Sequence, residues 1–518
     1  MADDASVSTS RMTAVGVTVG GSEQTATAFD LDAVLDRYGS VCPTCGTEAE
    51  ALVIERDGRM YQRTLCPAHH GTENLILSDI RIHKKLEDWN RRVFTGEGDA
   101  HVDEDSDKAP LLALVDLTNR CNFACPVCFA SASSEGVYYL DVETVRRMLT
   151  ALVTHKPLPC RHIQFSGGEP TLHPQFLDIV QMARDMGFNH IQVATNGSMF
   201  ATPGFARKCE AAGLHTLYLQ FDGMDDVVYQ TLRGRPLLEQ KLKAFAMIEE
   251  TGMRVVLVPT IVAGVNVDQL GPIFNFALEH SHHVTGISVQ PMAATGRVKV
   301  PGQGSFNLVD MANEFGRQTG LTRFPDDWFP LNSLTMLTRG VSRLRGEPAQ
   351  NPACDAYCSV GTYFHVDDGN QATCLTRFFD LEGFLRTIGD TPITRSNGFF
   401  ARQISGIAQL KTLSSCFDGK NAPKGLSFLR LLKGLDGWED KTVGRGQSWF
   451  QRGFNGMFFA GMHFMDATNF STRRAHRCII KYVTTDGRLV SFCNYNSGAR
   501  HRDAEELIRL GQCNQGAH

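Results

Sequence analysis

Three cysteines stand close together in the segment LTNRCNFACPVCFA. Cys121, Cys125 and Cys128 have the spacing C-x3-C-x2-C, and they directly follow an apolar run of strand length. Iron–sulfur clusters take cysteine thiolates as ligands, so three thiols this close suit a single cubane cluster. Three ligands leave one iron open to bind a further molecule, as the open position of a catalytic metal does. A zinc site and unpaired thiols are the alternatives.

A second group of metal-binding residue types lies near the N-terminus. Cys42, Cys45, Cys66 and His69 give the pattern C-x2-C followed by C-P-x-H, which predicts a tetrahedral site with three sulfurs and one nitrogen. Zinc and a mononuclear, rubredoxin-like iron both accept such a site. His69 aligns best as the fourth ligand, and His70 is the alternative.

A third group of cysteines is spread over the C-terminal part, where ligands from several segments can converge. Its members are Cys354, Cys358, Cys374, Cys416, Cys478 and Cys493. The group predicts one or two auxiliary clusters, and zinc or buried thiols are the alternative. Two saturated cubanes need about eight ligands, so two clusters on these six cysteines would require a non-cysteine ligand or an open iron. Asp486-Gly487 predicts a two-residue hairpin turn that brings Cys478 near Cys493. The isolated Cys160, Cys209 and Cys513 are expected to be buried cysteines that bind no metal.

Further polar motifs follow successive apolar runs. FSGGEPTLHP contains Gly167, Gly168 and Glu169, and glycines allow backbone to approach a ligand closely. ATNG contains Asn196, LQFDG contains Gln220 and Asp222, and TLRGRP contains Arg233. We expect Gln220 and Asp222 to point toward the same rim of strand ends, and all four residues to bind the cofactor. Taken singly, each of these residues suits a turn or a helix cap equally well.

The elements that position these residues are predicted by alternating apolar runs and amphipathic segments. The expected strands are 111–117, 162–165, 190–195, 216–221, 254–262 and 285–290. One helix is expected to begin after the N-cap Asp141, and further helices are expected at about 174–187, 203–213, 236–252 and 267–281. This alternation predicts an α/β fold of βα units with a parallel sheet, forming a partial (β/α)6 barrel. Catalytic groups gather at the C-terminal strand ends of such barrels, where the motifs fall.

Composition divides the chain into segments. We expect a disordered lead (1–28), a metal-binding domain (29–95), an acidic linker (96–109), a barrel core (110–300), a cysteine-bearing C-terminal domain (301–500) and a tail (501–518). The net charge of −5 gives no pull toward nucleic acid. The first residues lack the basic and apolar regions of a signal peptide, so we expect a cytoplasmic protein, in which 15 cysteines favour metal chemistry.

The cysteine triad, the Gly-Gly-Glu motif and the ATNG segment together resemble the radical S-adenosylmethionine (SAM) superfamily, although Val127 stands where an aromatic residue is common. The resemblance implies that the open iron binds the amino and carboxylate groups of SAM. It places the Gly167–Glu169 backbone near the SAM amino group, Asn196 near the ribose or carboxylate, and Arg233 near the carboxylate. An electron from the cluster would split SAM into methionine and a 5′-deoxyadenosyl radical, which abstracts hydrogen from an unactivated carbon.

A narrower resemblance covers roughly residues 35–500. The CPxC…CPxH head, the Cys-SVGTY segment and the HFMD…N…RC…DG…FCxYN tail are similar to the radical SAM family that includes the archaeal tetraether lipid synthase. It implies a radical SAM barrel with a rubredoxin- or zinc-ribbon-like N-terminal domain and a C-terminal auxiliary [4Fe–4S] cluster domain. Its activity would be C–C bond formation on a lipid chain. The Phe/Met-rich stretch 454–464 could line a tunnel for such a chain, and ordinary hydrophobic core is the alternative.

Other functions remain open at this point. The alternatives are a radical SAM methylase or another enzyme that modifies a pterin-like small molecule, a peptide-modifying enzyme, and a non-enzymatic electron carrier. We expect a reducing partner such as ferredoxin or flavodoxin, a lipid or small-molecule substrate, and, for a lipid, transient contact with a membrane.

Overall fold

A computed structural model describes residues 34–96, 109–136, 138–300, 304–345, 348–390, 411–435, 456–499 and 513–514. The expected disordered lead, most of the acidic linker and most of the tail lie outside the described residues, so those predictions stay untested.

The N-terminal unit is a four-stranded antiparallel sheet, here called the ribbon. It consists of β1 (Val34–Val41), β2 (Glu48–Arg56), β3 (Arg59–Cys66) and β4 (His69–Leu77), in that order. Asp57 and Gly58 join β2 to β3 with positive φ angles of 52° and 71°, as a two-residue hairpin turn of this hand requires. Helix α1 (His83–Thr95) follows the ribbon.

The core is a parallel sheet built from the six predicted βα units. Its strands are β5 (Leu112–Thr118), β8 (His162–Gly167), β9 (His190–Thr195), β10 (Thr216–Gln220), β11 (Arg254–Val258) and β13 (Val284–Pro291), and spatial neighbours are also neighbours in sequence. The predicted helices are α3 (Val142–Val153), α4 (Phe176–Asp185), α5 (Phe205–Ala212), α7 (Leu238–Ile248) and α8 (Leu270–Glu279). Asp141 caps α3 by accepting from the Thr144 N–H. Helix α6 (Asp226–Arg233) was not predicted.

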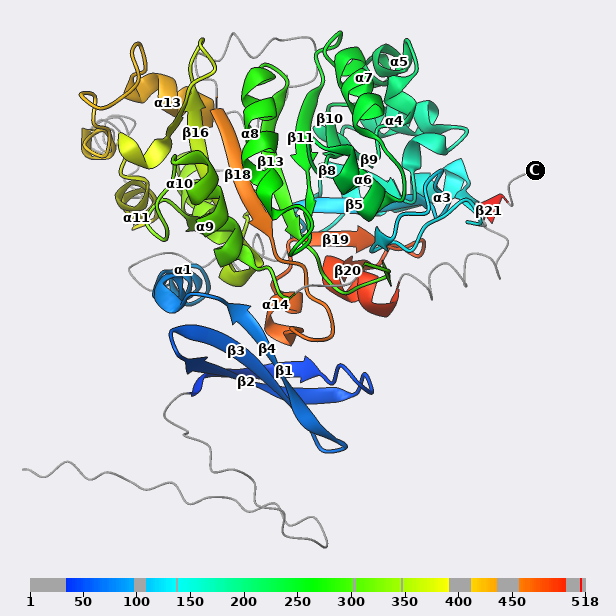
Figure 1. The fold of residues 1–518 in the computed structure, drawn as a ribbon. Helices are drawn as coiled ribbons and strands as arrows, with labels where there is room; N and C mark the ends of the chain where they lie inside the picture. The colour runs from blue at the N-terminus through cyan, green and yellow to red at the C-terminus, as the bar shows by residue number, and fades with distance from the viewer. Residues whose placement is uncertain are drawn as a thin grey trace, which may run out of the picture.

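The C-terminal region extends this same sheet at both edges. Strand β18 (Gly456–Met462) lies parallel to β13, and β16 (Ser359–Val366) pairs antiparallel with β18. At the other edge, β19 (Ile480–Val483) lies parallel to β5 and continues into β20 (Leu489–Ser491) (Figure 1). Open sheet edges expose unpaired backbone groups, and these additions cover them. The C-terminal cysteines are thereby attached directly to the barrel sheet.

The hairpin turn between β19 and β20 is longer than predicted. The Thr484 N–H donates to Arg488 O at 2.9 Å, and the Gly487 N–H donates to Thr484 O at 2.8 Å. Gly487 has a φ of 84°, so it closes a three-residue loop with a left-handed residue. The prediction of a two-residue Asp486-Gly487 turn is therefore wrong, although the hairpin itself is present.

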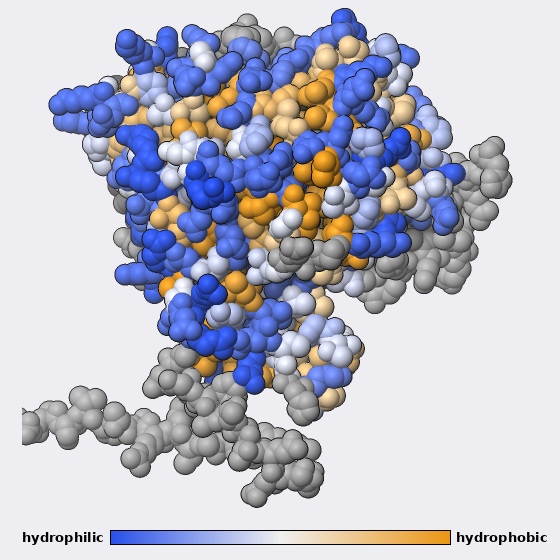
Figure 2. Space-filling model, in the orientation of Figure 1, coloured by the Kyte–Doolittle hydropathy of each residue, from blue (hydrophilic) through white to orange (hydrophobic). Residues whose placement is uncertain are grey.

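The ribbon docks on the segment that precedes and includes α14 (Thr472–His476) (Figure 1). Ser40 Oγ and Gln62 Nε2 both donate to Phe470 O, at 2.8 and 3.2 Å. Asn74 Nδ2 donates to Thr468 O at 3.0 Å. The ribbon protrudes from the main body in Figure 2, on a face where hydrophilic and apolar residues are interspersed. Among the described residues, no helix combines the length and apolar character needed to cross a membrane.

Candidate active site and metal centres

The cysteine loop begins where β5 ends, and backbone contacts hold it. The Cys121 N–H donates to Ser133 O at 2.9 Å, and Val127–Cys128 pair with Arg297–Val298 as short strands β6 and β14. Arg297 Nε donates to Cys125 O at 2.6 Å. The thiols of Cys121, Cys125 and Cys128 all line one large cavity. Burial raises the pKa of Cys121 to about 12 and also raises that of Cys125, so these thiols need a cationic partner to ionise.

The glycines of the Gly-Gly-Glu turn pack against this loop. The Gly168 N–H donates to Thr118 O and the Glu169 N–H donates to Arg120 O, both at 2.8 Å. A Cβ on Gly167 would lie 2.2 Å from Thr118 O, and one on Gly168 would lie 2.0 Å from Arg120 O. Both glycines line the cavity, but their lack of a side chain serves the close approach to the cysteine loop.

Glu169 holds the end of the neighbouring strand. Its fully buried carboxylate accepts from Thr171 Oγ1 at 2.5 Å, Thr195 Oγ1 at 2.8 Å and the Asn196 N–H at 2.7 Å. Burial raises its pKa, and these hydrogen bonds oppose the rise. Asn196 in turn donates from Nδ2 to Asn122 Oδ1 at 2.8 Å, and the same nitrogen lies 3.8 Å from Cys121 Sγ.

Arg233 and Asp222 form a buried bidentate ion pair. Arg233 Nε and Nη2 lie 2.6 and 2.7 Å from the two Asp222 oxygens, and Nη1 donates to Val127 O at 3.0 Å, beside Cys128. Gln220 Nε2 also donates to Asp222. Arg233 and Gln220 line the cavity, whereas Asp222 is completely buried behind it. Asp222 therefore orients Arg233, and the predicted position of Asp222 at the edge of the cavity is wrong.

Lys241 was missed in the sequence. It lies on α7 and donates from Nζ to Asn196 O at 2.6 Å and to Gln220 O at 2.8 Å. Its position in the sequence could have indicated a buried role, because it shares the apolar face of the helix with Ala244, Phe245 and Ile248. A lysine at i, i+3, i+4 and i+7 spacing with such residues must point toward the sheet.

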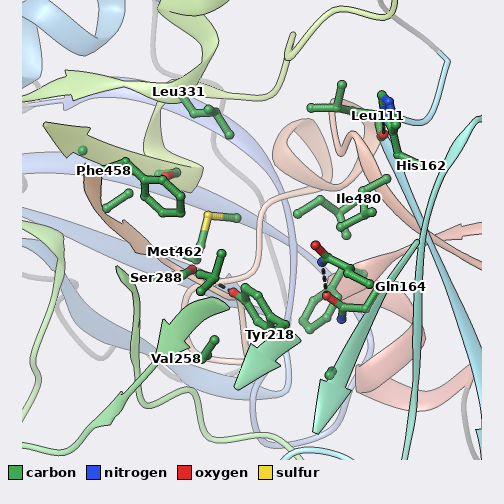
Figure 3. A pocket seen from close by; sticks show the side chains of 18 of the residues that line it. Leu111, His162, Gln164, Tyr218, Val258, Ser288, Leu331, Phe458, Met462 and Ile480 are labelled. Carbon is green, nitrogen blue, oxygen red and sulfur yellow. Dashed lines mark hydrogen bonds between the residues drawn. The ribbon is translucent and has the colours of Figure 1, made fainter. Parts of the chain in front are cut away.

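The cavity has a volume of about 1670 Å³ and reaches from the cysteine loop into the barrel. One wall is polar, and its residues are Gln164, Gln192, Tyr218, Ser288 and Gln290, here called the polar wall. Gln192 Nε2 donates to Gln164 Oε1 at 2.5 Å, and Tyr218 and Ser288 share a hydrogen bond of 2.7 Å. Other lining residues are apolar, among them Phe458, Met462 and Ile480 (Figure 3).

The Phe/Met-rich stretch lies half in the core and half on the cavity. Phe458, Ala460 and Met462 of β18 line the cavity, whereas Met457 and Phe459 are buried away from it. This division follows from the two-residue period of a strand. Residues 454 and 455 lie outside the described residues.

The four predicted N-terminal ligands converge in the ribbon. The donor atoms of Cys42, Cys45, Cys66 and His69 all lie within 4.8 Å of one another. His69 Nδ1 is 3.6 Å from Cys42 Sγ and 3.5 Å from Cys66 Sγ, distances that suit one tetrahedral ion. Hydrogen bonding to Thr47 lowers the pKa of Cys45 to about 6, which favours the thiolate that binds metal. The side chain of His70 lies outside what the structure describes.

Of the six C-terminal cysteines, four converge and two do not. Cys354, Cys358, Cys478 and Cys493 are here called the auxiliary thiols. Burial first, and then the charges of Cys358, Asp355 and Cys478, raise the pKa of Cys354. Burial first, and then the charge of Cys478, raises the pKa of Cys493. Cys374 is instead buried against Thr362 and Thr376, with sulfur–oxygen distances of 3.4 and 3.2 Å.

Cys416 also lies away from the auxiliary thiols. It packs in a separate apolar cluster with Phe417, Leu413 and Phe378. The structure does not bring Cys374 and Cys416 to the auxiliary thiols, so metal binding by these two cysteines stays a prediction without support from the fold. Four thiols suffice for one saturated cubane cluster.

A parallel barrel with three thiols after its first strand, next to a Gly-Gly-Glu turn after the second, defines an enzyme of the radical SAM class. Residues 115–277 match the radical SAM superfamily, and residues 34–78 match the "HMPTM N-terminal zinc ribbon domain". The chain is 33% identical over 484 residues to a Methanocaldococcus jannaschii protein named 7,8-dihydro-6-hydroxymethylpterin dimethyltransferase, covering 90% of this chain and 94% of that protein. The chain therefore belongs to the radical SAM family of that dimethyltransferase.

More distant similarity covers a smaller part of the chain. A probable GTP 3′,8-cyclase of Sulfurisphaera tokodaii is 26% identical over 165 residues, covering 32% of this chain and 51%, about half, of that protein. Streptococcus suis SuiB bound to S-adenosylmethionine has a TM-score of 0.36 and 17% identity, covering 41% of this chain and 47% of the other. So weak a structural similarity supports no conclusion about the site.

Family membership settles the main cofactors. The protein uses a [4Fe–4S] cluster and SAM, and its ribbon provides an N-terminal metal site. The residues present fit these groups, because three thiols on one loop face a cavity large enough for SAM, and three thiols and an imidazole converge in the ribbon. When bound, the cluster supplies the electron that cleaves SAM. The predicted lipid substrate finds no support in the similar proteins, one of which is named for a pterin.

Proposed function

We propose that this enzyme is a radical SAM methylase that acts on a small heteroaromatic molecule of the pterin kind. The polar wall carries the proposal. Pterin ring edges alternate hydrogen-bond donors and acceptors, and Gln164, Gln192 and Gln290 each present an amide that can do both. The name of the M. jannaschii relative supports the same class of substrate.

The ligand sets proposed for the cofactors follow the geometry. Cys121, Cys125 and Cys128 hold the SAM-binding cluster. The SAM subsite is formed by Gly167, Gly168, Asn196, Gln220 and Arg233, and Glu169 and Asp222 orient its members. Cys42, Cys45, Cys66 and His69 hold a mononuclear ion; the similarity to a zinc ribbon favours zinc over iron. The auxiliary thiols hold one further [4Fe–4S] cluster.

The polar wall also explains how a substrate would be oriented. Tyr218 accepts from Gln290 Nε2 at 3.2 Å and shares a hydrogen bond with Ser288, so its ring is fixed between β10 and β13. A planar ligand with hydrogen-bonding edges can replace these internal partners one for one. Apolar Met462 and Phe458 would then cover its face.

The test is anaerobic incubation of the reconstituted enzyme with 7,8-dihydro-6-hydroxymethylpterin, SAM and a reductant. A pterin product that carries one or two added methyl groups, each replacing a hydrogen, is expected, together with 5′-deoxyadenosine. If SAM is also the methyl donor, S-adenosylhomocysteine forms in step with methyl transfer. Abundant 5′-deoxyadenosine without any change in pterin mass would contradict the proposed substrate but leave the radical chemistry intact.

A second candidate function is C–C bond formation on an alkyl chain, favoured by a separate part of the cavity. Beyond the barrel the lining becomes apolar, with Leu337 of α10 (Thr335–Arg345), Phe384 of α11 (Leu381–Asp390) and Leu432 of α13 (Phe428–Leu435). A pterin bound at the polar wall would leave this apolar part of the cavity unfilled, whereas an alkyl chain could occupy it. Incubation with a lipid extract tests the alternative; a lipid product of joined chains would favour it over methylation.

The proposed setting is a cytoplasmic enzyme reduced by a ferredoxin or flavodoxin. An alkyl-chain substrate would add peripheral contact with a membrane. Fractionation of cells into soluble and membrane parts, with and without a high-salt wash, distinguishes the two settings.

A further inference from the structure

Lys241 is a buried cation behind the cysteine loop. Its side chain is 1% exposed and shares a helix face with the apolar Ala244 and Phe245. Burial lowers the pKa of Lys241 to about 7, while the charge of Asp222 opposes that effect. Taking an ammonium group out of water is strongly unfavourable unless hydrogen bonds replace the lost water. A lysine at this position therefore needs hydrogen-bond acceptors in place of the water that it loses on burial.

The partners are three acceptors on two neighbouring strand ends. Lys241 Nζ donates to Asn196 O at 2.6 Å, to Gln220 O at 2.8 Å and to Gln220 Oε1 at 2.6 Å. An ammonium group has three donors, so its hydrogen-bonding capacity matches this arrangement in full. The lysine thus ties the residue after β9 to the last residue of β10.

Each of these acceptors belongs to a hydrogen-bonded chain that ends on the cysteine loop. Asn196 donates to Asn122 Oδ1 at 2.8 Å, next to Cys121. Gln220 donates to Asp222, which binds Arg233, and Arg233 reaches Val127 O, next to Cys128, at 3.0 Å. Lys241 is the residue through which these two chains meet.

The charged groups around this point affect one another. Asp222, Glu169 and Cys125 raise the pKa of Lys241, and Arg233 lowers it. Replacing Lys241 would remove a source of positive charge beside a subsite that must accept the carboxylate of SAM.

We propose that Lys241 is a positioning residue that fixes Asn196 and Gln220 in the geometry that binds SAM, without touching SAM itself. The proposal rests on the cluster and SAM alone and does not depend on which substrate is modified. Lys241 lies outside the cavity lining, whereas Asn196 and Gln220 form part of it.

The test compares Lys241→Met, which keeps the length but removes every donor, with Lys241→Gln, which keeps two N–H donors without charge. Lys243→Met, two residues along on the exposed side of the same helix, is the matched control. The anaerobically reconstituted full chain is titrated with SAM, and the electron paramagnetic resonance spectrum of the reduced cluster is recorded with and without SAM.

We expect Lys241→Met to bind SAM at least tenfold more weakly and to lose the spectral change on SAM addition, with iron and sulfide contents unchanged. Lys241→Gln should lie between it and the parent, and Lys243→Met should match the parent. Parent-like affinity and spectrum in Lys241→Met would overturn the proposal. Equal loss of iron from all clusters in both Lys241 variants would overturn it too, because it would indicate a general role in folding.

Discussion

Arg474 donates from Nε to the thiol of Cys358 at 3.5 Å, and from Nη2 to His463 O at 2.5 Å. The guanidinium is buried, so it is the cation that faces the auxiliary thiols from α14. The adjacent Arg473 binds Asp36 of the ribbon at 2.5 Å and lies 3.3 Å from Asp355. One short helix thus connects the ribbon to the auxiliary thiols.

Arg474→Met should lower the reduction potential of the proposed auxiliary cluster. A buried cation stabilises the more negative, reduced state, and a hydrogen bond to a charged group is worth about 1.5–3 kcal/mol. For a one-electron couple this energy corresponds to a shift of about 65–130 mV. A spectroscopic redox titration measures the shift in a background lacking Cys121, Cys125 and Cys128. Arg488→Met, on the exposed hairpin, is the control; equal potentials in both variants would refute the role of Arg474.

Cys45→Ser should remove one metal ion per chain. Cys45, Cys66 and His69 converge on one tetrahedral position, and losing one of four ligands greatly weakens such a site. Elemental analysis after dialysis measures zinc and iron together. Cys209→Ala, a buried cysteine outside every thiol group, should keep the parent metal content. Full metal occupancy in Cys45→Ser would mean that the site is held differently.

Gly168→Ala should impair incorporation of the SAM-binding cluster. Its Cβ would lie 2.0 Å from the backbone oxygen of Arg120, so the cysteine loop must shift. Iron and sulfide analysis of the reconstituted protein reports the loss. Gly204→Ala meets no atom within 4 Å. It should cost only about 1–2 kcal/mol of backbone strain and leave the cluster content unchanged.

Cys358→Ser should reduce the iron content by about four atoms per chain, because it removes a ligand of one cubane cluster. Cys374→Ser and Cys416→Ser should leave it unchanged, since the structure places both thiols away from the auxiliary group. Iron loss in Cys374→Ser or Cys416→Ser would show that a second auxiliary cluster forms.

The sequence predicted the barrel well because its signals are local. Every predicted strand from 111–117 to 285–290 is present, since apolar runs and helix caps such as Asp141 act within a few residues. The cysteine triad was equally accessible through its spacing. The places of β18 and β19 at opposite edges of the sheet were not predictable, because strand pairing across more than a hundred residues leaves no local pattern.

The roles of individual side chains were harder to predict than the strands and helices that carry them. Asp222 was expected at the rim beside Arg233, but it lies behind the cavity and binds Arg233, and only the three-dimensional arrangement reveals that pairing. Nothing in the sequence separates Cys374 and Cys416 from the auxiliary thiols; the difference is their position in the folded chain. Lys241 was detectable in principle, as a charged residue on an apolar helix face.

Cleavage of SAM by the anaerobically reconstituted enzyme tests the central claim most directly. With a strong reductant, the parent chain should convert SAM to 5′-deoxyadenosine and methionine, measured by mass spectrometry. Replacing Cys121, Cys125 and Cys128 with Ala should abolish that conversion, while the ribbon metal remains bound. Continued formation of 5′-deoxyadenosine in the triple variant would contradict the assignment of these three cysteines as the SAM-binding site.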